Sequence, residues 1–281
     1  MLVAGTSGPF SRIYDFGARS AHNPSSRMCV GGISSGGDCG ELSALEGCVK
    51  EVIPDVYTFA GLIVGRAYLI KDSDGLTMID SGLPLAADKI VEQIEAAGYK
   101  ARDVRHILVT HAHPDHVGGL PRLKESTGAR VIASRTERPV IEGDAPLQRV
   151  LPERMSGLVQ KVRPSGMTLE GTPVDRGVDG GETLPEVMDG LRVIATPGHS
   201  PGHLSFWQPE RRLVFCGDVM VRRFGRLRLP FAAVTVDEDE NKRSVRKLAG
   251  LNAATMCFGH GNPLTRNTVQ IVRDFARQVG G

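Results

Sequence analysis

The residues best suited to chemistry gather in one short segment, 110–116, which reads THAHPDH. It places three histidines and an aspartate within six positions. Imidazole nitrogen and carboxylate oxygen are standard zinc ligands, and a catalytic site combines three or four such ligands with one open position. His199, Asp218 and His260 add further ligand types, so that five of the eight histidines belong to one set. This concentration predicts a metal-dependent hydrolase.

Each candidate ligand follows a segment expected to form a strand. The pairs are 105–110 with the histidine-rich segment, 191–195 with His199, 212–216 with Asp218, and 256–258 with His260. Side chains at strand ends are held by a rigid sheet, which is how sites on sheet scaffolds are commonly built. Because long stretches of chain separate the ligands, only a folded domain brings them together.

The rest of the chain alternates between strand and helix patterns. Further strands are predicted at 56–59, 62–70, 76–80, 130–133 and 203–207. Amphipathic helices are predicted at 86–97, 118–126, 240–249 and 265–278. This order of elements predicts an α/β protein.

The chain divides into three kinds of segment. Residues 1–47 are rich in Ser, Gly and Asn without periodicity, which predicts a flexible N-terminal extension. Residues 48–281 form the predicted hydrolase domain. Within it, 136–183 contains five prolines and only weak helical patterns, which indicates a surface insertion that forms a lid or wall of the substrate cleft.

Composition excludes several classes of protein. The apolar fraction of 41% and charged fraction of 23% are typical of soluble globular proteins. A formal charge of +2 gives no indication of a nucleic-acid or membrane partner, and no apolar run approaches the roughly 18 residues of a membrane helix. Five irregularly spaced cysteines and no secretory signal predict a cytoplasmic location. The expected partner is a small-molecule substrate, and a homodimer is left open.

The order of these motifs resembles a known signature. His-x-His-x-Asp-His at 111–116, then His199, Asp218 and His260, is similar to the metal-binding pattern of the metallo-β-lactamase fold superfamily. Asp80, within the run MIDSG at 78–82, matches that superfamily's first short motif. All five blocks occur in order across 52–264. The resemblance implies a four-layer αββα sandwich, of mixed α/β (α+β) class, with its site at one edge between two sheets.

The resemblance also implies a role for each ligand. A first metal would be held by His111, His113 and His199; a second by Asp115, His116 and His260; and Asp218 would bridge them. Two divalent ions about 3.5–4 Å apart can share a hydroxide, lower its pKa towards 7 and polarise a carbonyl. Zinc is the expected metal, with iron or manganese as alternatives. Asp115 and Asp218 are the expected catalytic carboxylates, while Asp80 is expected to fix a ligand's tautomer or rotamer.

The implied reaction is hydrolysis of an ester, thioester or lactone by attack of the bridging hydroxide on the carbonyl. β-Lactamases of this fold generally have Cys or Ser at the position of Asp218, which disfavours β-lactam hydrolysis. Related lactonases carry a tyrosine shortly after the bridging aspartate, and none lies between Asp218 and His260. Glyoxalase II resembles the ligand blocks best, but it has a helical C-terminal domain and here only 261–281 follow His260. Nuclease branches carry basic surfaces or additional domains that are not evident here.

Two other classes remain as alternatives. Persulfide dioxygenases share the fold and most of the ligands but use one iron at the three-histidine site. A non-catalytic scaffold would be expected to have lost at least one ligand, whereas all seven are present.

Three residues are candidates for binding substrate. The segment 221–228 contains four arginines, of which Arg222 and Arg226 are predicted to bind a carboxylate or phosphate through forked hydrogen bonds. A solvated basic loop is the competing interpretation. His203 is the third candidate, against the interpretation that it begins the next strand.

Overall fold

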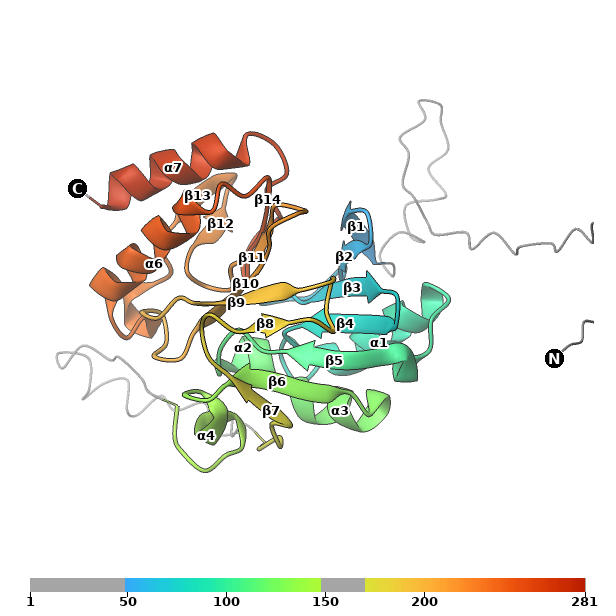
Figure 1. The fold of residues 1–281 in the computed structure, drawn as a ribbon. Helices are drawn as coiled ribbons and strands as arrows, with labels where there is room; N and C mark the ends of the chain where they lie inside the picture. The colour runs from blue at the N-terminus through green and yellow to red at the C-terminus, as the bar shows by residue number, and fades with distance from the viewer. Residues whose placement is uncertain (1–48, 148–169, 281) are drawn as a thin grey trace, which may run out of the picture.

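Two face-to-face sheets form the centre of the molecule in the computed structural model, which describes residues 49–147 and 170–280 (Figure 1). The first sheet contains seven described strands in the order β1 to β7. Their bounds are β1 Lys50–Ile53, β2 Val56–Thr58, β3 Tyr68–Asp72, β4 Gly75–Ile79, β5 Val104–Leu108, β6 Arg130–Ser134 and β7 Arg176–Val178. The pairs β4–β5, β5–β6 and β6–β7 are parallel, and the earlier pairs are antiparallel.

The second sheet contains five described strands in the order β14-β11-β10-β9-β8. Their bounds are β8 Thr183–Leu184, β9 Leu191–Ala195, β10 Leu204–Gln208, β11 Leu213–Phe215 and β14 Thr255–Cys257. A separate antiparallel hairpin joins β12 Val221–Arg223 to β13 Arg226–Arg228.

Helices cover the outer faces of both sheets. Their bounds are α1 Ala86–Ala96, α2 Pro114–Val117, α3 Leu120–Thr127, α4 Arg138–Ile141, α6 Glu238–Gly250 and α7 Thr268–Val279, with single 3-10 turns at η2 Ala101–Asp103 and η4 Ala232–Val234. Helices α1 and α3 lie on the first sheet, and α6 and α7 on the second (Figure 1). None of the described helices is long and apolar enough to span a membrane.

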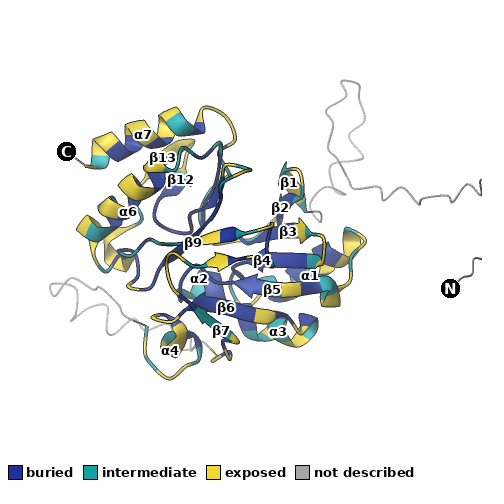
Figure 2. Cartoon of the chain, viewed as in Figure 1, coloured by how far each residue is buried: buried dark blue, intermediate teal, exposed yellow. Residues whose placement is uncertain are grey.

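Three apolar cores separate the four layers, because side chains alternate along each buried strand. On β6, Val131 packs with α1 and α3, whereas its neighbour Ile132 packs in the core between the sheets. On β11, Phe215 faces the core between the sheets, and Val214 packs towards α6 and α7. Figure 2 shows the result, with buried strands inside and exposed residues along the outer helix faces. The αββα arrangement expected from the resemblance is therefore observed.

One predicted strand, 62–70, is wrong over most of its length. Only Tyr68 onward is strand, and Ile63 in the preceding loop is 89% exposed. Gly65 explains the turn, since its φ is +72° and a Cβ there would lie 2.5 Å from the backbone oxygen of Asp115. The loop therefore passes directly against the segment that carries Asp115. The apolar residues of this segment give it the composition of a buried strand, but in the structure they form a loop that lines a cavity.

The proline-rich segment 136–183, predicted to be a surface insertion that forms a lid or wall of the cleft, contains strand residues at its described C-terminal end and contributes Leu147 to the cavity lining. That end contains β7, whose Val178 is fully buried, and the first residue of β8. Strands this short cannot be recognised from sequence periodicity, and the same applies to β1 and to the hairpin β12–β13. The middle of the segment, 148–169, lies outside the described residues, as does the predicted flexible extension 1–47.

Candidate metal centre

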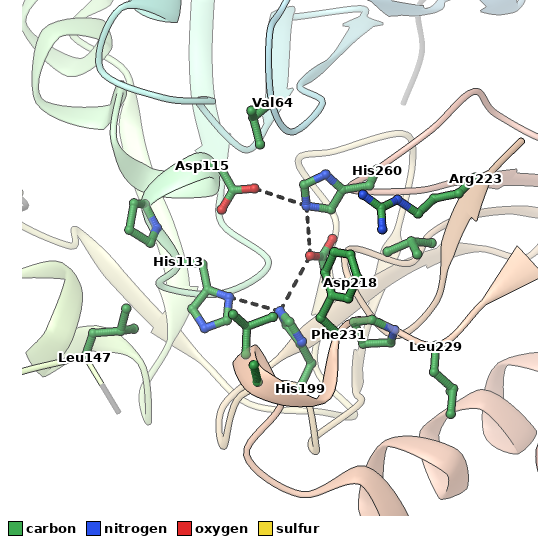
Figure 3. A pocket seen from close by; sticks show the side chains of 15 residues that line it. Val64, His113, Asp115, Leu147, His199, Asp218, Arg223, Leu229, Phe231 and His260 are labelled. Atoms are coloured by element: carbon green, nitrogen blue, oxygen red, sulfur yellow. Dashed lines mark hydrogen bonds and ion pairs between the residues drawn. The ribbon is translucent and has the colours of Figure 1, made fainter. Parts of the chain in front are cut away.

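All seven predicted metal ligands converge at one edge of the two sheets. A chain of close contacts connects five of them in Figure 3. The distances are 2.9 Å from His113 Nδ1 to His199 Nε2, 3.5 Å from His199 Nε2 to Asp218 Oδ2, 3.1 Å from Asp218 Oδ2 to His260 Nε2, and 3.1 Å from His260 Nε2 to Asp115 Oδ2. The other two, His111 and His116, are fully buried behind them, with ring centroids 4.1 Å apart.

Local structure explains how one short segment supplies four of these residues. His113 is the N-cap of α2 and Pro114 its first residue, a position that proline favours because its φ suits the helix and its missing N–H needs no partner. The helical turn closes with a 2.9 Å hydrogen bond from the His116 backbone N–H to the His113 carbonyl. Asp115 and His116 are thereby presented on a single turn after β5.

The remaining ligands come from loops of the second sheet. Asp218 follows β11 and His260 follows β14, and these strands are parallel neighbours, so their carboxyl ends meet at the same edge. Gly259 permits the close approach, since a Cβ there would lie 2.0 Å from Asp218 Oδ1 and 2.7 Å from His116 Cε1. His199 lies in the loop between β9 and β10.

The donor atoms are arranged to receive a metal. Five buried side-chain polar atoms lack a hydrogen-bond partner among the described residues, and three of them belong to this cluster: His111 Nε2, His116 Nε2 and Asp218 Oδ1. Buried polar atoms normally have partners, so such orphans need a reason. His111, His113 and His199 offer ligand atoms within 4.8 Å of one another, and so do Asp115, His116 and His260. The residues therefore fit divalent metal, and Asp218 contacts members of both groups.

The histidine tautomers follow from their outward hydrogen bonds. His116 Nδ1 donates to Asp80 Oδ2 at 2.7 Å, which leaves Nε2 as the nitrogen that faces the other candidate ligands. His111 Nδ1 donates to Thr110 Oγ1 at 3.0 Å, and that hydroxyl donates to Asp80 Oδ2 at 2.8 Å. His199 Nδ1 contacts Thr235 Oγ1 at 3.2 Å. Asp80 thus orients one ligand directly and another through Thr110, as carboxylates do at metal sites.

Charge is distributed unevenly over the cluster. Burial lowers the pKa of His199 to about 3 and that of His113 to about 4, so both rings are neutral near pH 7. Burial also opposes charging of His260, but hydrogen bonds to Asp115 and Asp218 outweigh it and raise the pKa to about 9. A metal bound by His260 must therefore displace a proton.

His203, predicted as a substrate contact, lies behind the site and not in its cavity wall. The residue is 1% exposed, and its Nε2 accepts a 3.0 Å hydrogen bond from the Asp218 backbone N–H. Its Nδ1 contacts Thr196 Oγ1 at 2.8 Å. His203 thus holds the Asp218 loop and is not among the residues that line the cavity.

The two predicted substrate arginines also lie away from the cavity. Arg222 Nη1 donates to the carbonyls of Asn262 and Pro263, and Arg226 is exposed on β13. Their neighbour Arg223 lines the cavity instead, with its guanidinium 4.4 Å from the centroid of the Phe231 ring. Strand alternation is the reason, because Arg222 and Arg223 point to opposite faces of β12. The sequence could have distinguished Arg223 from Arg222 only if β12 had been recognised as a strand, because the alternation follows from the strand.

The cavity over the metal cluster has a volume of about 520 Å³, within the usual range for a small-molecule site. One wall consists of the ligands His113, Asp115, His199, Asp218 and His260. The rest of the lining is mainly apolar and includes Val64, Leu147, Val221, Leu229, Phe231 and Val234. A substrate in this cavity would contact both apolar side chains and the ligand cluster.

Sequence reasoning missed Glu137, a buried carboxylate that joins two ligand-bearing loops. Its Oε1 accepts hydrogen bonds from Ser200 Oγ and the Gly202 backbone N–H, each at 2.7 Å. Its Oε2 accepts one from the Ala112 backbone N–H at 3.2 Å. Glu137 therefore ties the loop of His111 and His113 to the loop of His199, and no local pattern in the sequence marked it.

Replacing Glu137 with glutamine should lower metal affinity by roughly 10–100-fold, as loss of an outer hydrogen-bonding group typically does. The amide NH₂ group of the glutamine would face an N–H or O–H donor instead of accepting from it. This should reduce the free energy of unfolding by about 1–3 kcal/mol. Zinc titration and denaturant unfolding of the metal-free protein measure the two effects. Glu142→Gln is the matched control, because Glu142 pairs with Arg138 and the Val174 N–H, away from the ligand loops. Equal zinc affinity in the two variants would contradict this role.

Comparison with known proteins identifies the same family over most of the chain. The sequence profile described as "Metallo-beta-lactamase superfamily" matches residues 60–260. The Bacillus subtilis (strain 168) protein named "Probable metallo-hydrolase YflN" is 28% identical over 221 residues, covering 72% of this chain and 82% of that protein. A Rhodospirillum rubrum protein named hydroxyacylglutathione hydrolase is 30% identical over 210 residues, covering 73% of this chain and 66% of that enzyme.

Solved structures show the same fold. A metallo-beta-lactamase family protein from Thermus thermophilus superposes with a TM-score of 0.60 at 23% identity, covering 81% of this chain and 80% of that one. A subclass B3 metallo-beta-lactamase of Bradyrhizobium japonicum superposes with a TM-score of 0.57 at 25% identity, covering 83% and 93%. The fold expected from the sequence resemblance is confirmed.

Proposed function

Because this chain belongs to the metallo-beta-lactamase superfamily, we propose that it is a dinuclear metal-dependent hydrolase that cleaves a thioester, ester or lactone. The observation that carries the proposal is the assembly of two three-residue ligand groups with the Asp218 carboxylate between them. Similarity to a protein named hydroxyacylglutathione hydrolase supports a thioester in first place. We propose zinc as the metal, with manganese or iron as alternatives.

Divalent ions held by these ligands would supply an activated water and polarise the substrate carbonyl. The chain's own residues do the rest. Asp218, which is buried and contacts His199, His116 and His260, would hold both ligand groups together. Asp115, whose side chain is 19% exposed and lies at the cavity surface, would orient the attacking water. Thr110, Thr235 and Asp80 keep the ligand nitrogens aimed at the centre.

The remaining features of the proposal rest on the sequence. The low net charge and the cavity support a small-molecule substrate and no nucleic-acid or membrane partner. Cysteine usage supports a cytoplasmic location. Homodimer formation stays a prediction.

The competing function, iron-dependent oxidation of a persulfide, needs only the three-histidine group. Assembly of Asp115, His116 and His260 into a second group favours the dinuclear hydrolase. The two functions differ in metal content and in the reaction catalysed, so one experiment separates them.

Elemental mass spectrometry on the full chain, purified without added metal, should find roughly two zinc ions per chain. The same protein should hydrolyse acyl thioesters faster than aryl esters, lactones or a chromogenic β-lactam. One iron per chain with oxygen uptake on a persulfide would overturn the proposal. Two metals with no turnover of any thioester, ester or lactone would refute the substrate class while leaving the metal centre intact.

A further inference from the structure

A second cavity of about 670 Å³ adjoins the metal cavity, and Val64, Arg223 and His260 line both. On the basis of the hydrolase function above, we propose that the substrate joins an apolar part and an anionic part across the scissile bond. The apolar part occupies the metal cavity, and Arg66 and Arg223 bind the anionic part in the second cavity, which we call the basic cavity.

The charge of the basic cavity supports an anionic ligand. Lys50, Arg66 and Arg223 line it, with Glu51 as the one acidic residue among its described lining. Neither Arg66 nor Arg223 has an ion-pair partner within the described ranges. Arg66 Nη2 donates to Asn262 Oδ1 at 2.5 Å, and its Nη1 approaches Thr58 Oγ1 at 3.4 Å. Neutral acceptors therefore orient the guanidinium without cancelling its charge.

The two arginines are positioned by the same segments that build the metal site. Arg66 follows Gly65, whose backbone is packed against Asp115, and its partner Asn262 lies two positions after His260. Arg223 is held over Phe231 by a cation–π contact at 4.4 Å. Figure 3 shows its guanidinium beside His260, at the side of the cavity away from His113. An anion held here lies next to the ligand cluster.

The metal cavity suits the opposite end of such a substrate. Its lining includes three exposed apolar residues, Phe231 (63% exposed), Val234 (48%) and Val64 (43%). Exposed apolar side chains gathered around one opening mark a binding surface for apolar groups. Arg222 and Arg226, by contrast, line neither cavity and are not part of this site.

Carboxylates and phosphates share the oxygen geometry that a guanidinium recognises, so both belong in the test. With metal-loaded full chain, kcat/KM is compared for octanoyl thioesters of 3-mercaptopropionate, 2-mercaptoethyl phosphate and neutral mercaptoethanol. An octanethiol ester of succinate reverses the two ends, and acetyl thioesters lack the apolar part. Substrates that carry both an apolar and an anionic end, in either order, should have a kcat/KM about tenfold or more above that of substrates with only one such end. The reason is that charged hydrogen bonds and buried methylenes each contribute that much.

The arginine variants assign the effect to the basic cavity. Arg66→Gln and Arg223→Gln should each reduce the anionic-to-neutral ratio of kcat/KM by about tenfold, mainly through KM. Arg228→Gln, on the same hairpin but lining neither cavity, should preserve the ratio. An unchanged ratio in both cavity variants would overturn the proposal, as would equal kcat/KM for octanoyl and acetyl substrates.

Binding of thioether analogues separates this inference from the proposed function. S-octyl 3-mercaptopropionate and S-octyl mercaptoethanol cannot be hydrolysed, so calorimetry with them does not depend on turnover. Tighter binding of the anionic analogue, lost in Arg66→Gln, would support the basic cavity even if no thioester is cleaved. Equal binding of the two analogues would refute it even in an active hydrolase.

Discussion

Replacing Asp218 with alanine should abolish turnover and reduce metal content together. The carboxylate lies 3.1 Å from His260 Nε2 and 3.5 Å from both His199 Nε2 and His116 Nε2, so it contacts both ligand groups. Among the described residues its buried Oδ1 has no hydrogen-bond partner, as expected of an atom that would bind a metal. Loss of this charge should remove several kcal/mol of transition-state stabilisation, a decrease in kcat/KM of roughly 10³-fold or more.

Elemental analysis and steady-state kinetics on the same preparation measure both effects, with circular dichroism to establish that the variant is folded. Asp179→Ala is the control, since Asp179 is an exposed aspartate paired with Arg135. If Asp218→Ala kept more than about a tenth of the activity with one metal bound, a loss far below the expected several kcal/mol, Asp218 would not be the shared ligand.

Replacing Asp80 with asparagine should lower metal affinity and activity by roughly 10–100-fold, although Asp80 touches no metal in the proposed arrangement. Its Oδ1 accepts from the Thr110 backbone N–H at 2.8 Å, and its Oδ2 accepts from Thr110 Oγ1 and His116 Nδ1. An amide keeps the first bond but turns its NH₂ group towards His116. The imidazole would then carry its proton on Nε2, the atom that the metal needs.

Metal content, zinc affinity and kcat/KM of Asp80→Asn should be compared with those of Asp72→Asn. Asp72 lies on the same sheet and accepts from the Met188 N–H at 2.9 Å and from Thr77 Oγ1 at 3.3 Å, but it contacts no ligand. Both variants should lose stability, since each leaves buried donors poorly paired. Only Asp80→Asn should lose metal, and equal metal content in the two would refute the tautomer role.

The convergence of the candidate ligands could be predicted because it depends on local features. Residue type decides which atoms can bind a metal, and the spacing at 111–116 works because one helical turn presents Asp115 and His116 together. Strand 191–195 has the predicted bounds, and most other strands and helices lie within a few residues of theirs. Long amphipathic or apolar segments show their periodicity without reference to the rest of the chain.

The direction in which a side chain points and the residues that it contacts depended on the fold. Arg222 and Arg223 are adjacent and chemically alike, yet only Arg223 faces the cavity, because β12 sets their direction. Residues 62–67 have strand-like composition but form a loop where Gly65 meets the backbone of Asp115.

The sequence by itself determined the seven candidate ligands, their order, and the family to which the chain belongs. Tertiary structure alone decided how those residues are held. Glu137 joins Ala112, 25 residues away, to a loop that contains Ser200 and Gly202, 63 and 65 residues away, and His203 supports Asp218. The physical reason is that ligand identity is a property of single residues, whereas hydrogen bonds between distant segments exist only after the sheets have packed. The same packing placed Arg66 and Arg223 beside one cavity and left Arg222 and Arg226 outside it.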